Sequence, residues 1–558
     1  MKKLITLSLA FTLLLSCSSE RNDSENSIPS EGNNPSEGSN PSEAEVNSVR
    51  INSLGFLPSQ QKEATIASET ERFSLKRADN NETVFQKKAA GPFTQKDTGE
   101  KLWIANFSEF TTDGEYYIEI DDGLRSVNFP IGSNIYNEPF AVAMNGFYLL
   151  RCGAPVHAEH NGDIFEHPGC HHEDGYGDYI GHADTQFDGT GGWHDAGDYG
   201  KYTVNAGITM GVLLSTWDYF RPGNEAGSLP DFLQELKWEM GWMLKMPYPD
   251  GSGRVSHKLT RTNFSGFIMP QEDQAKRYFT EWSSAATASF AATAAKASRI
   301  FANYDKEYAD KCLTAARLSY NFLKENPKEK PFEQGVFETG GYQTGDKDDR
   351  LWAAAELWET TGETVYLKDF EKMASEIDYN SDENWDWGNV ANLALFTYAL
   401  SERSGRDPQA LQSIRENIIK TSDIITQKSE SDQYRRPLDR YYWGCNGTVV
   451  RQTLNLYVAN KLQPDSKYTN TALNAIGHLF GRNYFSRSYV TGVGHNPPMS
   501  PHDRRSGADN IEAPWPGYLV GGGHTATDWV DEEEDYARNE IAINWQAPLV
   551  FALAWMMN

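Results

Sequence analysis

Two aspartates, Asp195 and Asp198, lie three residues apart in the segment GGWHDAGDYGKYTVNAG (191–207). The small residues Ala196 and Gly197 between them allow both carboxylates to approach one spot from a tight loop. Such a pair could activate a water molecule by general base catalysis. By itself the spacing also fits a turn, a helix cap or a calcium ligand, so a catalytic interpretation requires partners elsewhere in the chain.

Two further segments contain residue types that could complete such a site. The segment DYARNEIAINWQAPLVFALAWM (535–556) places Glu540 at the start of an apolar helix, where a carboxylate could also serve the helix dipole. The segment VTGVGHNPPMSPHDRRSG (490–507) carries His502 and Arg504 in a Pro-bounded loop that cannot be regular helix. Polar, rigid loops of this kind position ligands more often than they fill cores.

Together the three segments resemble glycoside hydrolase family 9, which includes many cellulases. The strings DAGDYGKY, NPPMSPHDR and NEIAIN occur in that order, and the resemblance extends from about residue 136 to the C-terminus. It implies inverting hydrolysis of β-1,4-linked glucans, with Asp198 as general base, Asp195 holding the same water and Glu540 as general acid. Inversion requires the two carboxyls to lie about 6.5–9.5 Å apart. The acid must also keep its proton, so we expect burial or the neighbouring aspartates to raise the pKa of Glu540.

The same resemblance implies that His502 and Arg504 bind sugar hydroxyls at the cleavage point. The planar guanidinium suits this role because it can meet two oxygens at once. Sugar rings present flat C–H faces, so aromatic platforms should line the cleft, with core packing as the alternative for each ring. The candidates are Trp385, Tyr441, Tyr442, Trp443 and Trp545, the last of which stands where many family members have Tyr.

Four cysteines follow Cys17 in the sequence, and in a secreted chain they could form two disulfides. The segment RCGAPVHAEHNGDIFEHPGCHHEDG (151–175) combines two of them with several histidines, and another histidine directly precedes Asp195. Two thiolates and two imidazoles make the closed tetrahedral set that zinc prefers, and family members with an N-terminal module resemble this pattern. We therefore expect structural zinc on Cys152, Cys170, His171 and His194, with His157, His160, His167 and His172 as reserve ligands and a Cys152–Cys170 disulfide as the alternative.

Two acidic segments could bind calcium. Asp346, Asp348 and Asp349 in TGDKDDR supply hard oxygen ligands at close spacing. Ser506 and Asp509 in SGADNI resemble a calcium loop of related enzymes. A solvated acidic turn is the alternative for both segments.

The elements that would position these residues fall into two parts, so the sequence predicts a multi-domain protein. Residues 46–133 alternate apolar and polar side chains between Asp-Gly turns, which predicts an all-β sandwich, and VNSVRINSLGFLPSQQKEATIAS at its start resembles the immunoglobulin-like module of bacterial cellulases. Residues 134–558 carry roughly a dozen stretches with helical periodicity. This count suits the all-α (α/α)6 barrel that the family resemblance implies, and no fixed repeat supports a helical solenoid.

The N-terminus has the features of an export signal. Residues 1–17 combine Lys2 and Lys3 with a short apolar run that ends in Leu-Leu-Ser-Cys, which resembles a bacterial lipobox with Cys17 as the lipidated residue. Residues 18–45 are rich in Pro, Ser, Glu and Asn, which predicts a disordered linker. We expect a lipid-anchored protein of the outer membrane, exposed at the cell surface as in Bacteroidetes-type lipoproteins.

The net charge of 51 − 78 = −27 argues against nucleic acid as a partner. No organic cofactor is expected, and we expect a monomer. The expected activity is that of an inverting endo-β-1,4-glucanase acting on xyloglucan, mixed-linkage glucan or amorphous cellulose. The alternatives are an exo-acting β-glucosidase or glucosaminidase of the same family, and a non-catalytic surface glycan-binding lipoprotein, against which the presence of all three acidic residues argues.

Overall fold

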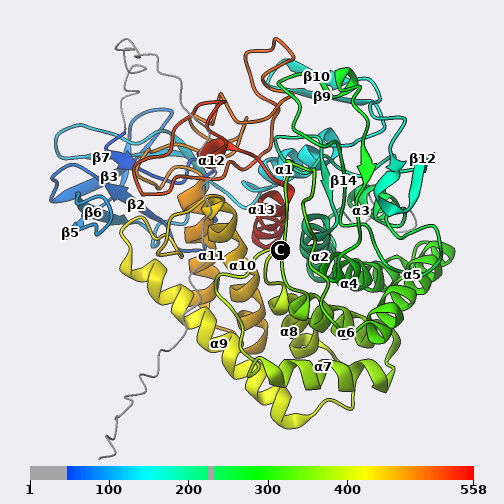
Figure 1. Ribbon diagram of the computed structural model, residues 1–558. Helices are drawn as coiled ribbons and strands as arrows, with labels where there is room; N and C mark the ends of the chain where they lie inside the picture. Colours follow the sequence, from blue (N-terminus) through cyan, green and yellow to red (C-terminus); the bar gives the residue numbers. More distant parts are fainter. Residues whose placement is uncertain (1–46, 224–230) are drawn as a thin grey trace, which may run out of the picture. The chain divides into compact units, whose positions relative to one another are not determined.

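The computed structural model describes residues 47–223 and 231–558. They form an N-terminal β-sandwich and a C-terminal helical barrel, as the sequence predicts (Figure 1). The export signal 1–17 with Cys17 and the linker 18–45 lie outside the described residues. Within the described ranges, no helix is both long and apolar enough to cross a bilayer.

Two four-stranded antiparallel sheets, β1-β2-β6-β5 and β4-β3-β7-β8, share the core of the sandwich. Apolar side chains on alternate strand positions form this core. In β6, for example, Leu102 and Ile104 are buried while the residue between them is not. Phe56 meets the rings of Phe107 and Phe129 edge-on at 5.1 and 5.4 Å. The strands are β1 (Val49–Arg50), β2 (Glu63–Ile66), β3 (Arg72–Arg77), β4 (Thr83–Lys88), β5 (Ala90–Thr94), β6 (Lys101–Asn106), β7 (Gly114–Ile120) and β8 (Phe129–Ile131).

Six helices form the closed inner ring of the barrel, and each packs against the next. The C-terminal helix α13 closes the ring by packing against both α10 and α2 (Figure 1). These helices are buried on nearly every face; in α4, Ala and Ser residues allow the neighbouring helices to approach closely. The inner helices are α2 (Thr203–Phe220), α4 (Ser284–Phe301), α6 (Lys347–Thr361), α8 (Ala391–Leu400), α10 (Cys445–Leu462) and α13 (Ile543–Met556).

The outer helices are amphipathic and cover the inner ring. In α5 the buried residues include Ala309, Cys312, Ala316, Tyr320 and Leu323, a spacing of three and four residues that puts them on one face. The outer helices are α1 (Asn137–Leu149), α3 (Asp231–Met243), α5 (Lys306–Glu325), α7 (Thr364–Glu376), α9 (Pro408–Ser431) and α11 (Ser466–Leu479), and a short helix α12 (Tyr536–Asn539) precedes α13.

Short strands in the long loops of the barrel are absent from the sequence-based prediction. They form a hairpin of β9 and β10 and a five-stranded sheet with the order β12-β11-β15-β14-β13. Several are only two or three residues long, which is too short to show an alternating pattern. The strands are β9 (Val156–His160), β10 (Asp163–His167), β11 (Tyr176–Gly177), β12 (His182–Gln186), β13 (Lys201–Tyr202), β14 (Lys258–Thr260) and β15 (Tyr278–Phe279).

Glu63 on β2 joins the sandwich to the barrel. Its Oε2 accepts hydrogen bonds from Arg435 Nε at 2.9 Å and Arg482 Nη2 at 3.0 Å. Thr65 extends this contact, because its hydroxyl donates to the Gln433 carbonyl at 2.6 Å and accepts from Arg482 Nε at 3.0 Å. The junction is therefore a buried polar network rather than a loose contact.

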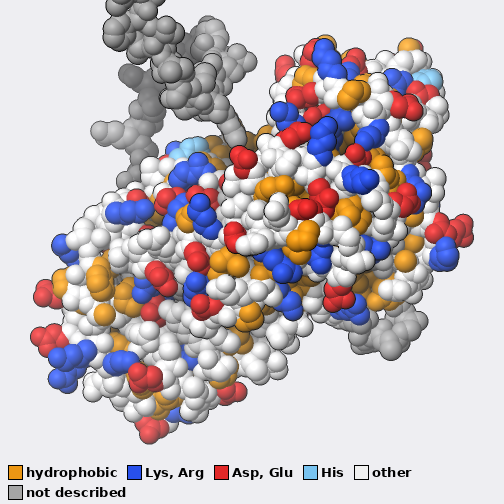
Figure 2. Space-filling model, turned by 90° about the horizontal axis from the view of Figure 1, so that it is seen from below, with side chains coloured by type: hydrophobic (Ala, Val, Ile, Leu, Met, Phe, Trp, Pro, Cys, Tyr) orange, Lys and Arg blue, Asp and Glu red, His pale blue; other side chains and the backbone are white. Residues whose placement is uncertain are grey.

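Charged side chains of both signs are interspersed on the face drawn in Figure 2. Elsewhere in the molecule oppositely charged side chains pair, as Lys324 does with Asp369 at 2.7 Å. The face seen in Figure 2 therefore offers no extended basic surface to a polyanion.

Candidate active site

The loop before α2 and the segment before α13 meet at one end of the barrel. The Ile543 amide donates to the Asp195 carbonyl at 2.9 Å, and Ala196 forms a bridge with Ala542. The Asp195 amide in turn donates to the Gly200 carbonyl at 3.0 Å, which closes the loop that carries both aspartates. Residues more than 340 positions apart in the sequence are therefore joined by backbone hydrogen bonds.

Asp195 is 1% exposed, and both of its carboxylate oxygens accept hydrogen bonds. Asn205 Nδ2, on α2, donates to Oδ1 at 2.7 Å, and the Tyr342 hydroxyl donates to Oδ2 at 2.6 Å. Burial and the nearby Asp198 charge raise the pKa of Asp195 to about 8, although these two donors oppose the shift. Asp195 therefore resists ionisation beside a second acidic group.

Asp198 lies in the same loop and is also buried. Its Oδ2 accepts from the Gly200 amide at 2.8 Å and from the Tyr202 hydroxyl at 2.8 Å. Gly200 is needed at this turn, because a Cβ there would lie 2.3 Å from the Tyr202 hydroxyl oxygen. The loop therefore holds the Asp198 carboxylate through both backbone and side-chain donors.

Glu540 lies between α12 and α13, in an extended segment that is bridged to His502. Burial, followed by the charges of Asp198 and Asp195, raises its pKa well above the ordinary carboxyl value, while Arg504 opposes the shift. This agrees with the raised pKa that the sequence analysis expected for the acid. The Ala196–Ala542 bridge also brings the segment that begins at Glu540 against the aspartate loop.

His502 and Arg504 border the same loop. Arg504 Nη1 donates to the Gly197 carbonyl at 2.6 Å and its Nε to the Ser265 carbonyl at 3.1 Å. The ring of His502 is oriented by a 2.6 Å hydrogen bond between Nδ1 and the Glu533 carbonyl, and burial lowers its pKa. Arg504 thus supports the aspartate loop, and the contact of His502 and Arg504 with sugar hydroxyls stays a prediction.

The five aromatic candidates differ in how far their rings are exposed to solvent. Trp385 is 1% exposed and its Nε1 donates to Asn455 Oδ1, so the prediction that it is a sugar platform is wrong. Trp545 is only 6% exposed and lies perpendicular to Trp443, which it supports at 6.2 Å between ring centroids.

Trp443 itself is 51% exposed and therefore has a ring surface available for stacking. Tyr441 and Tyr442 are half-buried. Tyr441 lies under the guanidinium of Arg436 at 3.9 Å, which occupies one face of its ring. Trp443 is thus the strongest of the five candidates for a sugar platform.

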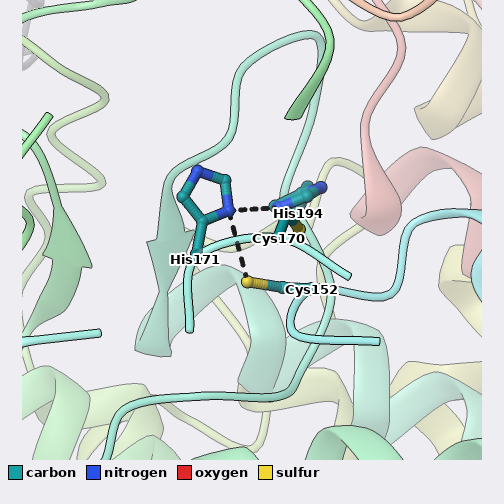
Figure 3. A group of neighbouring side chains, drawn as sticks. All are labelled: Cys152, Cys170, His171 and His194. Carbon is teal, nitrogen blue, oxygen red and sulfur yellow. Dashed lines mark hydrogen bonds between the residues drawn. The ribbon is translucent and has the colours of Figure 1, made fainter. Parts of the chain in front are cut away.

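Cys152, Cys170, His171 and His194 form one cluster, and their possible ligand atoms all lie within 4.8 Å of one another (Figure 3). His171 Nδ1 is 3.6 Å from Cys152 Sγ and 3.4 Å from His194 Nε2. Cys170 Sγ is 3.9 Å from His194 Nε2. All four cysteines of the described residues are free thiols, so the disulfide alternative is wrong.

The surroundings of this cluster lower the pKa of one thiol and orient one imidazole, as a metal site requires. Burial raises the pKa of the Cys152 thiol, but Cys170, Lys201 and His194 outweigh burial and lower it well below its ordinary value. Behind the cluster, Asp273 Oδ2 lies 3.5 Å from His171 Nε2 and can orient that ring. Three of the four reserve ligands are engaged elsewhere: His157 with Glu166, His160 with the Gly492 carbonyl and His167 with the Pro168 carbonyl. The fourth, His172, is exposed.

The first calcium candidate lies at the start of α6. Asp349 is fully buried, and burial together with Asp348 and Asp346 raises its pKa well above the ordinary value. Asp348 accepts a hydrogen bond from the Val390 amide at 2.7 Å, and Asp346 pairs with Arg350 at 2.7 Å. A buried acidic group of this kind would be stabilised by a cation.

The second calcium candidate is held by Trp515. The Trp515 amide donates to Ser506 Oγ at 3.1 Å, and its Nε1 donates to Asp509 Oδ2 at 2.7 Å. These bonds give the loop a structural role without a metal. Calcium stays a prediction at both places.

Three residues that contact the aspartates were missed by the sequence analysis. Asn205 and Tyr202 lie inside the very segment that carries Asp195 and Asp198, so their hydrogen-bonding side chains were a usable signal. Tyr342 reaches Asp195 from 147 residues away, and nothing in its own segment indicated this contact.

Comparison with known proteins covers both parts of the chain. The family model for glycosyl hydrolase family 9 matches residues 136–553, and the model for the cellulase N-terminal ig-like domain matches residues 44–124. Endoglucanase D of Acetivibrio thermocellus is 52% identical over 522 residues, which cover 91% of this chain and 83% of that protein.

A xyloglucan-specific endo-beta-1,4-glucanase of Bacteroides ovatus is 31% identical over 555 residues, which cover 90% of this chain and 92% of that protein. Among solved structures, a metagenome-derived glycoside hydrolase family 9 endoglucanase has a TM-score of 0.85 and 32% identity. That alignment covers 91% of this chain and 98% of the other.

Proposed function

The chain belongs to glycoside hydrolase family 9, and from this premise we propose that it is an inverting endo-β-1,4-glucanase. The observation that carries the proposal is the meeting of Asp195, Asp198 and Glu540, with the pKa of Glu540 raised well above its ordinary value. Two relatives whose names state endoglucanase activity support a β-1,4-glucan polymer as the substrate class.

We infer complementary roles for the carboxyl groups. Because its pKa is raised well above the ordinary carboxyl value, Glu540 can hold a proton and donate it to the glycosidic oxygen as the bond breaks. Asp198 can accept a proton from a water molecule that attacks the anomeric carbon from the opposite face, and Asp195 helps to hold that water. One displacement of this kind inverts the anomeric configuration.

The activity test compares the loss of viscosity with the release of reducing ends on carboxymethylcellulose, mixed-linkage glucan and xyloglucan. We expect viscosity to fall early with few new ends, and Glu540→Gln or Asp198→Asn to lower the rate by several orders of magnitude. Glu534→Gln is the matched control, because Glu534 is an exposed acid in the same segment. Release of single sugars from chain ends would instead indicate an exo-acting enzyme, and binding without hydrolysis would indicate a glycan-binding protein.

We propose that Cys152, Cys170, His171 and His194 hold a structural zinc ion. With Zn–N of about 2.0–2.1 Å and Zn–S of about 2.3 Å, tetrahedral ligands lie about 3.3–3.8 Å apart. The observed separations of 3.4 and 3.6 Å fall in this range, and the Cys170–His194 separation of 3.9 Å lies just outside it. The ion would fix the loop that leads from His194 into Asp195 and leave no ligand position for water. Metal analysis should give one zinc per chain, lost in Cys152→Ser and kept in Cys312→Ser, whose thiol lies in α5.

We further propose calcium at the start of α6 and at the Ser506–Asp509 loop. The buried, mutually repelling carboxyls of Asp348 and Asp349 support the first site. Calcium titration of the chelated protein should raise the melting temperature of wild type, and raise that of Asp349→Asn by less, because this variant keeps only the second loop. The same titration of Asp509→Asn tests the second loop.

Finally, we propose that Cys17 is lipidated and tethers the enzyme to the outer membrane at the cell surface. The support is the sequence alone: a basic start, a short apolar run and Leu-Leu-Ser-Cys before a polar linker. Expression in a Gram-negative host followed by membrane fractionation tests it. Wild type should sediment with membranes and Cys17→Ser should not.

A further inference from the structure

Tyr202 contacts the residue that the proposed function makes the general base, and the inference below rests on that function. Tyr202 lies at the junction of β13 and α2 and is 1% exposed. Its hydroxyl lies 2.8 Å from Asp198 Oδ2. Tyr202 is therefore shielded from solvent and touches the site through Asp198.

The direction of this hydrogen bond is set by a third group. The Gly340 amide donates to the Tyr202 hydroxyl oxygen at 3.2 Å, so the hydroxyl hydrogen is free to point at Asp198. Lys258 holds the segment that presents this amide, because its Nζ donates to the carbonyls of Gly340 at 2.8 Å and Thr339 at 3.1 Å. The Gly340 amide thus orients the Tyr202 hydroxyl as a donor to Asp198.

Both hydrogen bonds to the Asp198 carboxylate, within the described part of the chain, end on the same oxygen. The Gly200 amide and the Tyr202 hydroxyl each donate to Oδ2 at 2.8 Å. Two donors hold Oδ2 in place, and no donor among the described residues is bonded to Oδ1. A general base needs one oxygen with a free lone pair facing the water.

We propose that Tyr202 is a positioning residue that fixes the Asp198 carboxylate so that Oδ1 takes the proton from water. The neighbouring ring extends the arrangement to the second aspartate. Tyr342 lies 5.0 Å from the Tyr202 ring, centroid to centroid, and its hydroxyl donates to Asp195 Oδ2 at 2.6 Å. Two packed tyrosines therefore orient the two aspartates relative to each other.

The test is Tyr202→Phe, which keeps the ring and removes only the hydroxyl. Tyr320→Phe is the matched control, because Tyr320 is also buried and its hydroxyl donates to Asp369 at 2.8 Å in the outer helices. We expect Tyr202→Phe to lower kcat on the glucan by on the order of tenfold or more, with KM unchanged. Tyr320→Phe should leave both constants unchanged, whatever either variant does to the melting temperature.

An activated substrate distinguishes a defect in protonation of the leaving group from a defect in deprotonation of water. An aryl β-cellobioside with a good leaving group needs little help from an acid, so Glu540→Gln should recover much of its rate on it. The loss in Tyr202→Phe should persist, because water must still be deprotonated. Lys258→Met is a second test. It removes the hydrogen bonds that hold the Gly340 segment, so it should also lower kcat.

Several results would overturn the proposal. These are a wild-type kcat in Tyr202→Phe, a loss confined to KM, or recovery on the activated substrate. A wild-type protein with no glucanase activity would overturn the proposed function as well, whereas an active wild type with a normal Tyr202→Phe overturns this inference alone.

Discussion

Glu63 gives the sharpest prediction about how the two parts of the molecule are held together. Burial raises its pKa, but Arg482 and Arg435 outweigh burial and lower it to about 2 from an ordinary 4.5. That difference corresponds to about 3 kcal/mol of stability at neutral pH. The Glu63 side chain is 6% exposed, so solvent screens these ion pairs only weakly.

The perturbation is Glu63→Gln, which keeps the shape and removes the charge. Because Arg482 is then left buried without its partner, we expect a loss of about 3–5 kcal/mol at pH 7. If the sandwich and barrel unfold together, this lowers the melting temperature by about 3–5 °C. Activity well below the melting temperature should be unchanged.

The pH dependence has a definite sign. A carboxyl with a lowered pKa stabilises the folded state fully above pH 4.5, and this contribution is lost as the pH falls towards 2. The difference in melting temperature between wild type and Glu63→Gln, measured by scanning calorimetry, should therefore become smaller below pH 4.5. Glu109→Gln is the control, because its ion pair with Lys87 is exposed. A Glu63→Gln protein that melts like wild type at pH 7 would refute this account of the junction.

Three further predictions concern the site. Cys152→Ser should lower the melting temperature and kcat together, measured by calorimetry and polymer hydrolysis, because the loop into Asp195 loses its anchor. Asp195→Asn should abolish hydrolysis but raise the melting temperature. The raised pKa of Asp195 makes wild type lose stability as the pH rises from about 4 to about 8, so the difference in melting temperature between variant and wild type should be absent near pH 4 and grow up to about pH 8. Trp443→Ala should raise KM on glucan about 3- to 10-fold with little change in kcat, since an exposed stacking face is lost.

The sequence predicted those features that have a local signature. The alternation in β6 and the three-and-four spacing in α5 marked the sandwich and the outer helices directly. The Asp195–Asp198 loop and Glu540 were found because each lies in a distinctive string. The cluster of Cys152, Cys170, His171 and His194 was found because thiols and imidazoles are rare enough for their grouping in the sequence to be noticed.

Features that depend on distant contacts were not predictable in the same way. Trp385 looks like any aromatic residue near a helix start, and only the packed barrel shows that its ring is buried against Asn455. Tyr342 reaches Asp195 across 147 residues, and no local pattern encodes that approach. The two-residue strands β11 and β15 pair through the tertiary fold, so their sequences carry no alternation to detect.

The central claim is hydrolysis by a single displacement at Asp198 and Glu540, and the configuration of the newly formed product tests it most directly. Proton NMR of a cello-oligosaccharide digest in its first minutes, before mutarotation, should show the α-anomer at the new reducing end. The signal should be absent with Glu540→Gln and present with Glu534→Gln. The β-anomer appearing first would contradict the account.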